Sequence, residues 1–246
     1  MNTRNDRATW VKGGSAKCSI PPRWRAQPPH LVLLGAPGVG KGTQAEFLCA
    51  GLKVCHLSTG DVFRAAKSLS DDEQTPPMKE ALVHMCHGEL VPDKTVLDLV
   101  RERKVCLRCG GGFLLDGFPR TVPQAEALEQ LLDEEKIRLD AVLNYTLPFA
   151  EIIERLSGRR TCQECRAVFH VVARPPHRPD VCDHCGGILV QREDDLPEVV
   201  EARMLAYEKE TKPLVDFYVG HGLLRTISAE GSPERIFERT LAILDN

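Results

Sequence analysis

HLVLLGAPGVGKGTQAEFLCAGL spans residues 30–52 and joins three patterns in a row. An apolar run from His30 to Leu34 predicts a short buried strand. Apolar residues at helical spacing after Thr43 predict a helix. The glycine-rich segment between them, from Gly35 to Thr43, has the spacing G-x-x-x-x-G-K-[ST]. Strand, loop and helix in this order predict a phosphate-binding loop for a nucleoside triphosphate.

Each part of this loop suits phosphate chemistry. Glycines let backbone N–H groups turn toward phosphate oxygens, and the N-terminus of the following helix adds a favourable dipole. Lys41 contributes a positive charge, and Thr43 contributes a hydroxyl group for Mg²⁺. A glycine turn with a purely structural role is the alternative, and the complete spacing disfavours it.

The alternation of strand and helix continues along the chain. Further strands are expected at residues 54–57, 111–116, 141–147 and 223–229. Helical spacing follows at residues 123–135 and in one long segment at residues 197–219. Alternating strands and helices favour a parallel sheet with right-handed crossovers. We therefore expect an α/β fold over residues 29–246, with a five-stranded parallel sheet flanked by helices, as in P-loop NTPases.

Two segments interrupt this alternation and are expected to be insertions. Residues 58–91 include the polar, proline-broken stretch SDDEQTPPM, and residues 158–195 contain paired cysteines. Residues 1–28 carry four Arg, two Lys and one Asp without a sustained apolar period, so a disordered basic tail is expected there. An organelle-targeting leader is the alternative for this tail, because such leaders are rich in Arg and poor in acidic residues.

Composition narrows the classes of function. The net charge of −3 does not favour binding to nucleic acid or to a membrane, both of which are negatively charged. No apolar run approaches the ~20 residues that span a bilayer. Ten cysteines without a secretory signal indicate a reducing compartment, so a cytoplasmic protein is expected. We also expect a monomer.

Four of the cysteines form two C-x₂-C pairs. Cys162 and Cys165 are separated by sixteen residues from Cys182 and Cys185. Four thiolates at this spacing predict a closed, structural Zn²⁺ site, since a catalytic zinc keeps one position open to water. The pair in KVCLRCGGG, residues 104–112, has no partner pair nearby. It is expected to be a loop dithiol, with a redox-sensitive disulfide as the alternative.

Charged residues follow the expected strand ends. Asp116 ends the apolar run FLLD and is the candidate residue to hold Mg²⁺. Phosphoryl transfer needs charge stabilisation and in-line positioning, which planar, permanently charged guanidinium groups supply. The candidate arginines fall within motifs or insertions and are Arg64, Arg120, Arg155, Arg159, Arg192 and Arg203.

Six motifs occur in one order, namely GAPGVGKGTQ, HLSTGDVFRAA, GELV, LLDGFPRTVPQ, GRR and QREDD. This ordered set resembles adenylate kinases from about His30 to the C-terminus. The resemblance implies reversible transfer of the terminal phosphate of Mg-ATP to AMP, giving two ADP. It also implies a CORE sheet, an AMP-binding insertion at residues 58–91 and a lid at residues 158–195 that closes over ATP. Some adenylate kinases carry a zinc lid, which agrees with the paired cysteines.

The resemblance further implies roles for individual residues. Lys41 would contact the transferred phosphate, and Asp116 would hold Mg²⁺ through water. The ATP site would comprise Gly38, Val39, Gly40, Lys41, Gly42, Thr43, Arg155, Arg159, Val168, Phe169 and Gly231. The AMP and transfer site would comprise Thr59, Arg64, Glu89, Leu90, Val91, Gly117, Phe118, Pro119, Arg120, Gln124, Arg192 and Arg203.

Thr59 and Gln124 indicate the acceptor nucleotide. In the family pattern this Gln hydrogen-bonds the adenine edge, and the Thr of STGD lines the AMP site. Related pyrimidine-nucleotide kinases usually carry Ala in the first motif and Asn in place of Thr121 and Gln124. A kinase for another nucleoside monophosphate is therefore the second hypothesis. The third hypothesis is a zinc-ribbon nucleic-acid binder that uses the glycine-rich loop as a nucleotide switch. Such a binder needs a basic stripe on the ribbon, and acidic residues in the ribbon offset its basic ones.

Overall fold

The computed structural model describes residue 10 and residues 28–66, 74, 76–108, 110–165 and 167–245, with the backbone alone at residues 76 and 77. Most of the expected N-terminal tail, most of the stretch SDDEQTPPM, and Cys109 lie outside these residues. The predictions made for those segments are therefore not addressed by the structure.

A parallel sheet of five strands forms the centre of the molecule, in the order β2-β3-β1-β4-β8. The strands are β1 (His30–Gly35), β2 (Cys55–Ser58), β3 (Phe113–Asp116), β4 (Ala141–Thr146) and β8 (Leu224–Ser228). The predicted α/β fold with a five-stranded parallel sheet is confirmed, and each strand lies within one or two residues of its predicted place.

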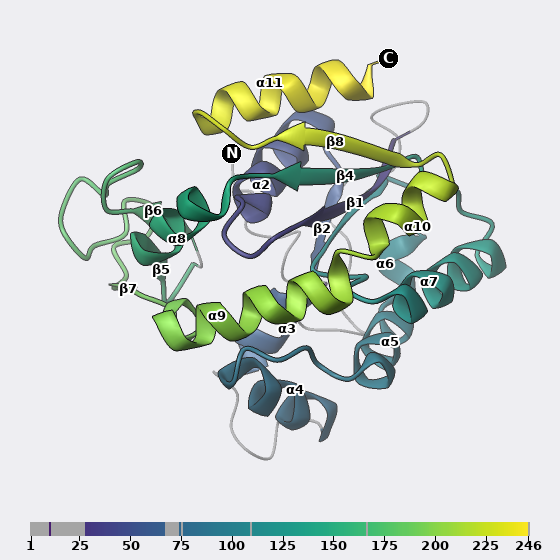
Figure 1. Ribbon diagram of the computed structural model, residues 1–246, viewed down its shortest axis with the longest axis horizontal. Helices are drawn as coiled ribbons and strands as arrows, with labels where there is room; N and C mark the ends of the chain where they lie inside the picture. The colour runs from purple at the N-terminus through teal and green to yellow at the C-terminus, as the bar shows by residue number, and fades with distance from the viewer. Residues whose placement is uncertain are drawn as a thin grey trace.

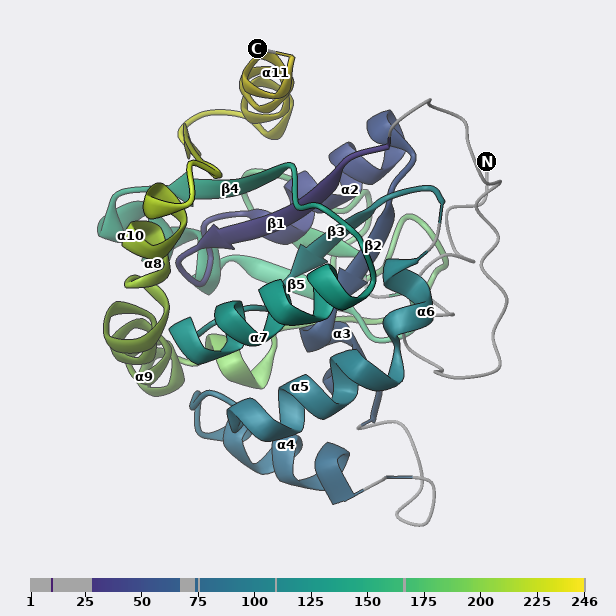
Figure 2. The ribbon, with the colours of Figure 1, turned by 90° about the vertical axis from the view of Figure 1, so that its right-hand side faces the viewer.

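Helices cover both faces of the sheet because successive strand residues point to opposite sides. Leu31 and Leu33 belong to a buried cluster that includes residues of α2 (Lys41–Leu52) and α11 (Pro233–Leu244). Val32 and Leu34 belong to a second cluster, on the opposite face. That cluster includes residues of α3 (Thr59–Ala66), α4 (Pro76–Cys86), α5 (Asp93–Glu102), α6 (Lys104–Leu107), α7 (Val122–Glu134) and α10 (Leu214–Gly220). Figure 1 shows α11 above the sheet and α7, α5 and α4 below it, and Figure 2 shows the same layers from the side.

Trp10 also belongs to the second cluster, and its side chain is 1% exposed. At this position the structure differs from the disordered tail expected for residues 1–28. The physical reason is that the indole finds an apolar site and a hydrogen-bond acceptor within the core.

A small antiparallel sheet projects from the end of α8 (Phe149–Ser157). Its strand order is β6-β5-β7, where the strands are β5 (Arg159–Cys162), β6 (Val168–His170) and β7 (Leu189–Val190). Figure 1 shows this unit at the far side of the molecule from α7. Its own buried cluster consists of Cys162, Phe169, Cys182 and Leu189.

The long helix expected at residues 197–219 is interrupted. It consists of α9 (Pro197–Ala206), a π-helical turn at Tyr207–Thr211 and α10. Pro213 explains the interruption, since it has no N–H to donate within a helix and its ring crowds the preceding turn. Among the described residues, no helix is long and apolar enough to cross a membrane.

Candidate active site

A cavity of about 320 Å³ opens where the central strands end. Its walls include Gly35 at the end of β1, Ser58 at the end of β2 and Asp116 at the end of β3. The carboxyl ends of parallel strands are the usual place for a ligand in an open sheet. The volume lies at the lower end of the range for small-molecule sites.

The glycine-rich loop forms one wall of this cavity. Gly38 and Gly40 have φ angles of +81° and +104°, and a Cβ atom on Gly38 would lie 2.7 Å from the side chain of Leu156. Lys41 Nζ donates hydrogen bonds to the carbonyl oxygens of Gly35 at 2.7 Å and Ala36 at 3.0 Å. Burial lowers the pKa of Lys41 to about 8, although the nearby negative charge of Asp116 acts to raise that pKa. An anion next to this ammonium group would offset that cost of burial.

Asp116 lies beside a histidine that the sequence analysis did not single out. His56 Nε2 is 3.2 Å from Asp116 Oδ2, and both side chains are largely buried. Burial alone would raise the pKa of Asp116, but the His56 hydrogen bond and the charges of His56 and Lys41 hold that pKa below its ordinary value. The Asp116 carboxylate therefore stays charged in the cavity wall. A charged oxygen ligand of this kind suits a hard cation such as Mg²⁺.

All six predicted arginines line this cavity. They are Arg64 in α3, Arg120 after β3, Arg155 in α8, Arg159 in β5, Arg192 after β7 and Arg203 in α9 (Pro197–Ala206). Burial, followed by the charge of Arg159, lowers the pKa of Arg192 to about 9. Burial and the charge of Arg203 lower the pKa of Arg120 to about 10. Crowded, buried cations of this kind are stabilised by a multiply charged anion such as a phosphate.

Acidic partners hold several of these arginines in place. Arg159 forms a paired contact with the Asp195 carboxylate, through Nε to Oδ2 at 2.7 Å and through Nη2 to Oδ1. Arg203 Nη1 donates to the same carboxylate at 3.1 Å and lies 3.2 Å from Asp194 Oδ2. Asp195 is 2% exposed, so these contacts are shielded from water. The QREDD motif thus supplies both an arginine and the carboxylates that orient its neighbours.

Arg155 has a different setting from the other arginines. Its guanidinium donates to the carbonyl oxygens of Val39 at 3.1 Å and Ala229 at 2.8 Å. Gln44 Nε2 makes a parallel link from α2 to the carbonyl of Pro233 at 2.9 Å. These contacts join the glycine-rich loop to the segment around Gly231, which lines the same cavity. Gln44 was not singled out from the sequence.

A second, smaller cavity of about 70 Å³ adjoins the first and shares Arg64, Arg120 and Arg203 with it. Gln124 lines this cavity and is 1% exposed. Its Oε1 accepts from the Arg120 backbone N–H at 2.8 Å, and its Nε2 donates to Asp93 Oδ1 at 2.6 Å. Asp93 was missed by the sequence analysis, although it stands directly after the GELV motif and Pro92.

A family model described as adenylate kinase matches residues 33–223. The chain belongs to the adenylate kinase family. It is therefore a nucleoside monophosphate kinase, a phosphotransferase that uses ATP and AMP.

Curated adenylate kinases resemble the chain over most of their own length. The enzyme from Carboxydothermus hydrogenoformans is 50% identical over 207 residues, covering 84% of this chain and 95% of the relative. The enzyme from Thermodesulfovibrio yellowstonii is 46% identical, covering 88% of this chain and 99% of the relative. The enzyme from Streptomyces coelicolor is also 46% identical, with 87% of this chain and 98% of the relative covered.

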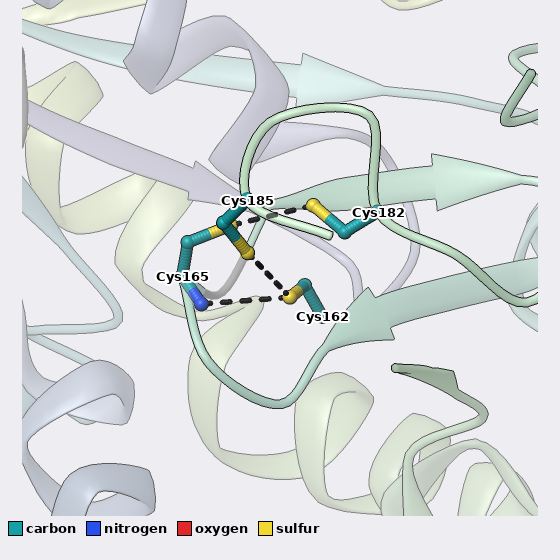
Figure 3. A group of neighbouring side chains, drawn as sticks. All are labelled: Cys162, Cys165, Cys182 and Cys185. Carbon is teal, nitrogen blue, oxygen red and sulfur yellow. Dashed lines mark hydrogen bonds between the residues drawn. The ribbon is translucent and has the colours of Figure 1, made fainter. Parts of the chain in front are cut away.

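Four cysteines of this adenylate kinase gather at the small sheet. The sulfur atoms of Cys162, Cys165, Cys182 and Cys185 all lie within 4.8 Å of one another. The sulfur atoms of Cys162 and Cys185 are 3.4 Å apart, and those of Cys165 and Cys182 are 3.5 Å apart. Figure 3 shows the four side chains pointing toward a common centre. Tetrahedral Zn–S bonds of ~2.3 Å separate the sulfurs by about 3.8 Å, so the donor set and its spacing fit a Zn²⁺ ion.

The structure brings most of the predicted site residues of the adenylate kinase together. The walls of the larger cavity include Gly38, Gly40, Lys41, Gly42, Thr43, Arg64, Leu90, Asp116, Gly117, Pro119, Arg120, Arg155, Arg159, Val168, Phe169, Arg192, Arg203 and Gly231. The walls of the smaller cavity include Thr59, Glu89, Val91 and Gln124. The side chains of Val39 and Phe118 are instead buried in the cores on the two faces of the sheet.

Proposed function

We propose that this adenylate kinase binds Mg-ATP in the larger cavity and AMP in the smaller one, and that phosphoryl transfer takes place where the two cavities share their arginines. The observation that carries this assignment is the junction itself. Arg64, Arg120 and Arg203 line both cavities, and Lys41 and Asp116 line the larger one. A phosphate bound in either cavity would face the same cations.

Transfer between these cavities needs no covalent intermediate on the protein. An oxygen of the AMP phosphate attacks the γ-phosphorus of ATP, the bond from that phosphorus to the β-phosphate oxygen breaks, and two ADP result. The protein supplies positioning and charge stabilisation, which dominate catalysis of phosphoryl transfer. Lys41 and the shared arginines are placed to hold the negative charge of the phosphoryl group.

Magnesium fits the carboxylate of Asp116 and the hydroxyl group of Thr43, both of which line the larger cavity. When bound, the ion would neutralise charge on the β- and γ-phosphates of ATP. His56 keeps the Asp116 carboxylate oriented and charged. Asp116 also lies opposite Ser58 in the sheet register, so its position is set by the strands rather than by a loop.

We propose that Gln124 reads the adenine of AMP, with Asp93 as the residue that orients it. A carboxylate only accepts hydrogen bonds, so Asp93 fixes the Gln124 amide with its NH₂ group toward the carboxylate. The second N–H and the free lone pair of Oε1 then match the N1 acceptor and the amino donor of adenine. Guanine presents a donor and an acceptor in the reverse order, and it would leave these buried groups unpaired.

We propose further that residues 58–91 form the AMP-binding insertion, and that residues 158–195 form a lid whose four cysteines hold a structural Zn²⁺. Two features of the lid support this role. Its buried cluster contains two of the four sulfurs, and Val168 and Phe169 line the larger cavity. A lid over ATP would exclude water, and so would favour transfer to AMP over hydrolysis.

A coupled assay of ADP formation tests the acceptor assignment, with ATP and a panel of AMP, GMP, CMP and UMP. We expect turnover with AMP and a loss of at least about a hundredfold in kcat/KM with each other acceptor. Comparable turnover with CMP or UMP would favour the alternative of a kinase for another nucleoside monophosphate. Comparable turnover with GMP would contradict the role given to Gln124 and Asp93.

A further inference from the structure

Trp10 lies ahead of the region that the family shares. The family model begins at residue 33, and the relatives are covered over 95–99% of their own length. The segment that carries Trp10 is therefore an addition to the common fold. Nevertheless, Trp10 is one of the largest fully buried side chains among the described residues, at 1% exposure.

Trp10 contacts the edge of the central sheet. β2 is the outermost strand on its side, and its last residue is Ser58. The indole Nε1 of Trp10 donates a hydrogen bond to the carbonyl oxygen of Ser58 at 2.9 Å. The next residue, Thr59, begins α3. The added segment thus holds the point where β2 ends and α3 begins.

α3 is the element that this contact would position. Thr59, Gly60, Phe63 and Arg64 all belong to α3 and line the smaller cavity, which we assigned to AMP. Ser58 Oγ also accepts a hydrogen bond from the Asp61 backbone N–H, so Ser58 is tied to the first turn of α3. A displacement of the Ser58 carbonyl would therefore be passed directly to the wall of the acceptor site.

A buried arginine holds Trp10 from the other side. Arg103 is 5% exposed, and its Nε donates to the Trp10 carbonyl oxygen at 2.8 Å. Its Nη1 donates to the Leu99 carbonyl at 3.3 Å and to Glu102 Oε2 at 3.1 Å. A buried guanidinium is costly unless its donors are paired. The added segment supplies one of these acceptors, so α5 and the segment depend on each other.

From these contacts we infer that Trp10 is a positioning residue for the acceptor site, which braces the junction of β2 and α3. This inference rests on the proposed placement of AMP in the smaller cavity. The Arg103 side chain holds the Trp10 carbonyl, and the indole N–H holds the Ser58 carbonyl. Trp10 raises affinity for AMP without touching it.

Steady-state kinetics of the full chain test the brace. Trp10→Phe keeps an aromatic ring in the core but removes the N–H donor. It should raise the KM for AMP about two- to tenfold, the range for loss of one hydrogen bond, and leave the KM for ATP unchanged. Leu132→Ala is the matched control, because Leu132 is a buried member of the same cluster in α7. It should lower the melting temperature without changing the KM for AMP.

An unchanged KM for AMP in Trp10→Phe would overturn the inference, as would equal rises in both KM values or an equal rise in Leu132→Ala. Failure of the proposed placement of AMP would look different, because Gln124→Ala, which alters the wall of the smaller cavity, would then also leave the KM for AMP unchanged. Failure of the brace alone leaves activity with AMP intact.

Fluorescence quenching tests the docking itself. The chain has two tryptophans, so Trp24→Phe leaves Trp10 as the sole indole. In that background the emission should resist quenching by acrylamide, and saturating AMP should increase the resistance. Arg103→Met in the same background should make Trp10 accessible to the quencher. Emission that is readily quenched without Arg103→Met, or that is insensitive to Arg103→Met, would show that Trp10 is not held as described.

Discussion

Replacing Cys182 with Ser should unfold the lid and leave the central sheet intact. The buried cluster of the lid has four members, of which two are cysteines of the proposed zinc site. The remaining two, Phe169 and Leu189, are each 3% exposed, and their burial contributes roughly 1.5–3 kcal/mol apiece. Two apolar side chains are a small core for a unit of this size, because ordering its backbone costs conformational entropy at every residue. A structural zinc site contributes about 10–16 kcal/mol, which makes the metal the larger stabilising contribution.

Metal analysis and limited proteolysis measure this effect. The unmodified enzyme should contain about one zinc per chain, and trypsin should cleave slowly after Arg160 and Arg192, which lie in the lid. Cys182→Ser should lose the zinc and become sensitive at these bonds, while far-UV circular dichroism reports an intact core. Cys86→Ser is the matched control, since Cys86 is an exposed cysteine in α4 outside the cluster. A zinc-free protein whose lid still resists trypsin would refute the reasoning.

The remaining predictions concern nucleotide binding and transfer. Lys41→Ala should lower kcat for ADP formation about a hundred- to thousandfold, because it removes a preorganised cation at the phosphates. The circular dichroism spectrum should stay unchanged, and near-native turnover would contradict the role of Lys41. Since burial lowers the pKa of Lys41 to about 8 and a bound phosphate favours its charged form, the KM for ATP should rise as pH increases above about 8, and a flat profile to pH 9.5 would count against this. Gln124→Ala should raise the KM for AMP on the order of tenfold and spare that for ATP, whereas equal losses would place Gln124 outside the acceptor site. Arg120→Lys should lose most of kcat, because an ammonium group cannot reproduce bidentate contact with phosphate, and wild-type rates would show that Arg120 is peripheral.

Several parts of the site were predictable because their signal is local. The glycine-rich loop is specified by residue types at fixed spacing, since Gly35, Gly38 and Gly40 each adopt a positive φ angle that favours glycine. The grouping of the four cysteines was predictable in the same way, because two C-x₂-C pairs predict a cluster of sulfur atoms before the fold is known. The resemblance to adenylate kinases rested on a series of such local motifs, and the family match confirms it.

Other parts depend on contacts between distant segments, and the sequence carried little signal for them. Asp93 contacts Gln124 across 31 positions, and His56 contacts Asp116 across 60. Both are polar residues in ordinary places, one at the start of a helix and one in a strand. A titratable side chain within the fully buried strand β2 was the available hint for His56. Nothing in the pattern said which residue would be its partner.

The sequence by itself determined the class of fold, the place of the glycine-rich loop between strand and helix, the cysteine pairs and the family, because periodicity and spacing act within a few residues of each position. The tertiary structure decided which arginines line one cavity, how the 197–219 segment is broken, and where Trp10 lies. Trp10 illustrates the physical reason. Residues 1–28 are basic and lack an apolar period, so local reasoning predicts disorder. The indole is nevertheless buried in an apolar cluster, where its N–H donates to the Ser58 carbonyl, 48 positions away. The backbone carbonyl of Trp10 accepts from the Arg103 guanidinium, 93 positions away.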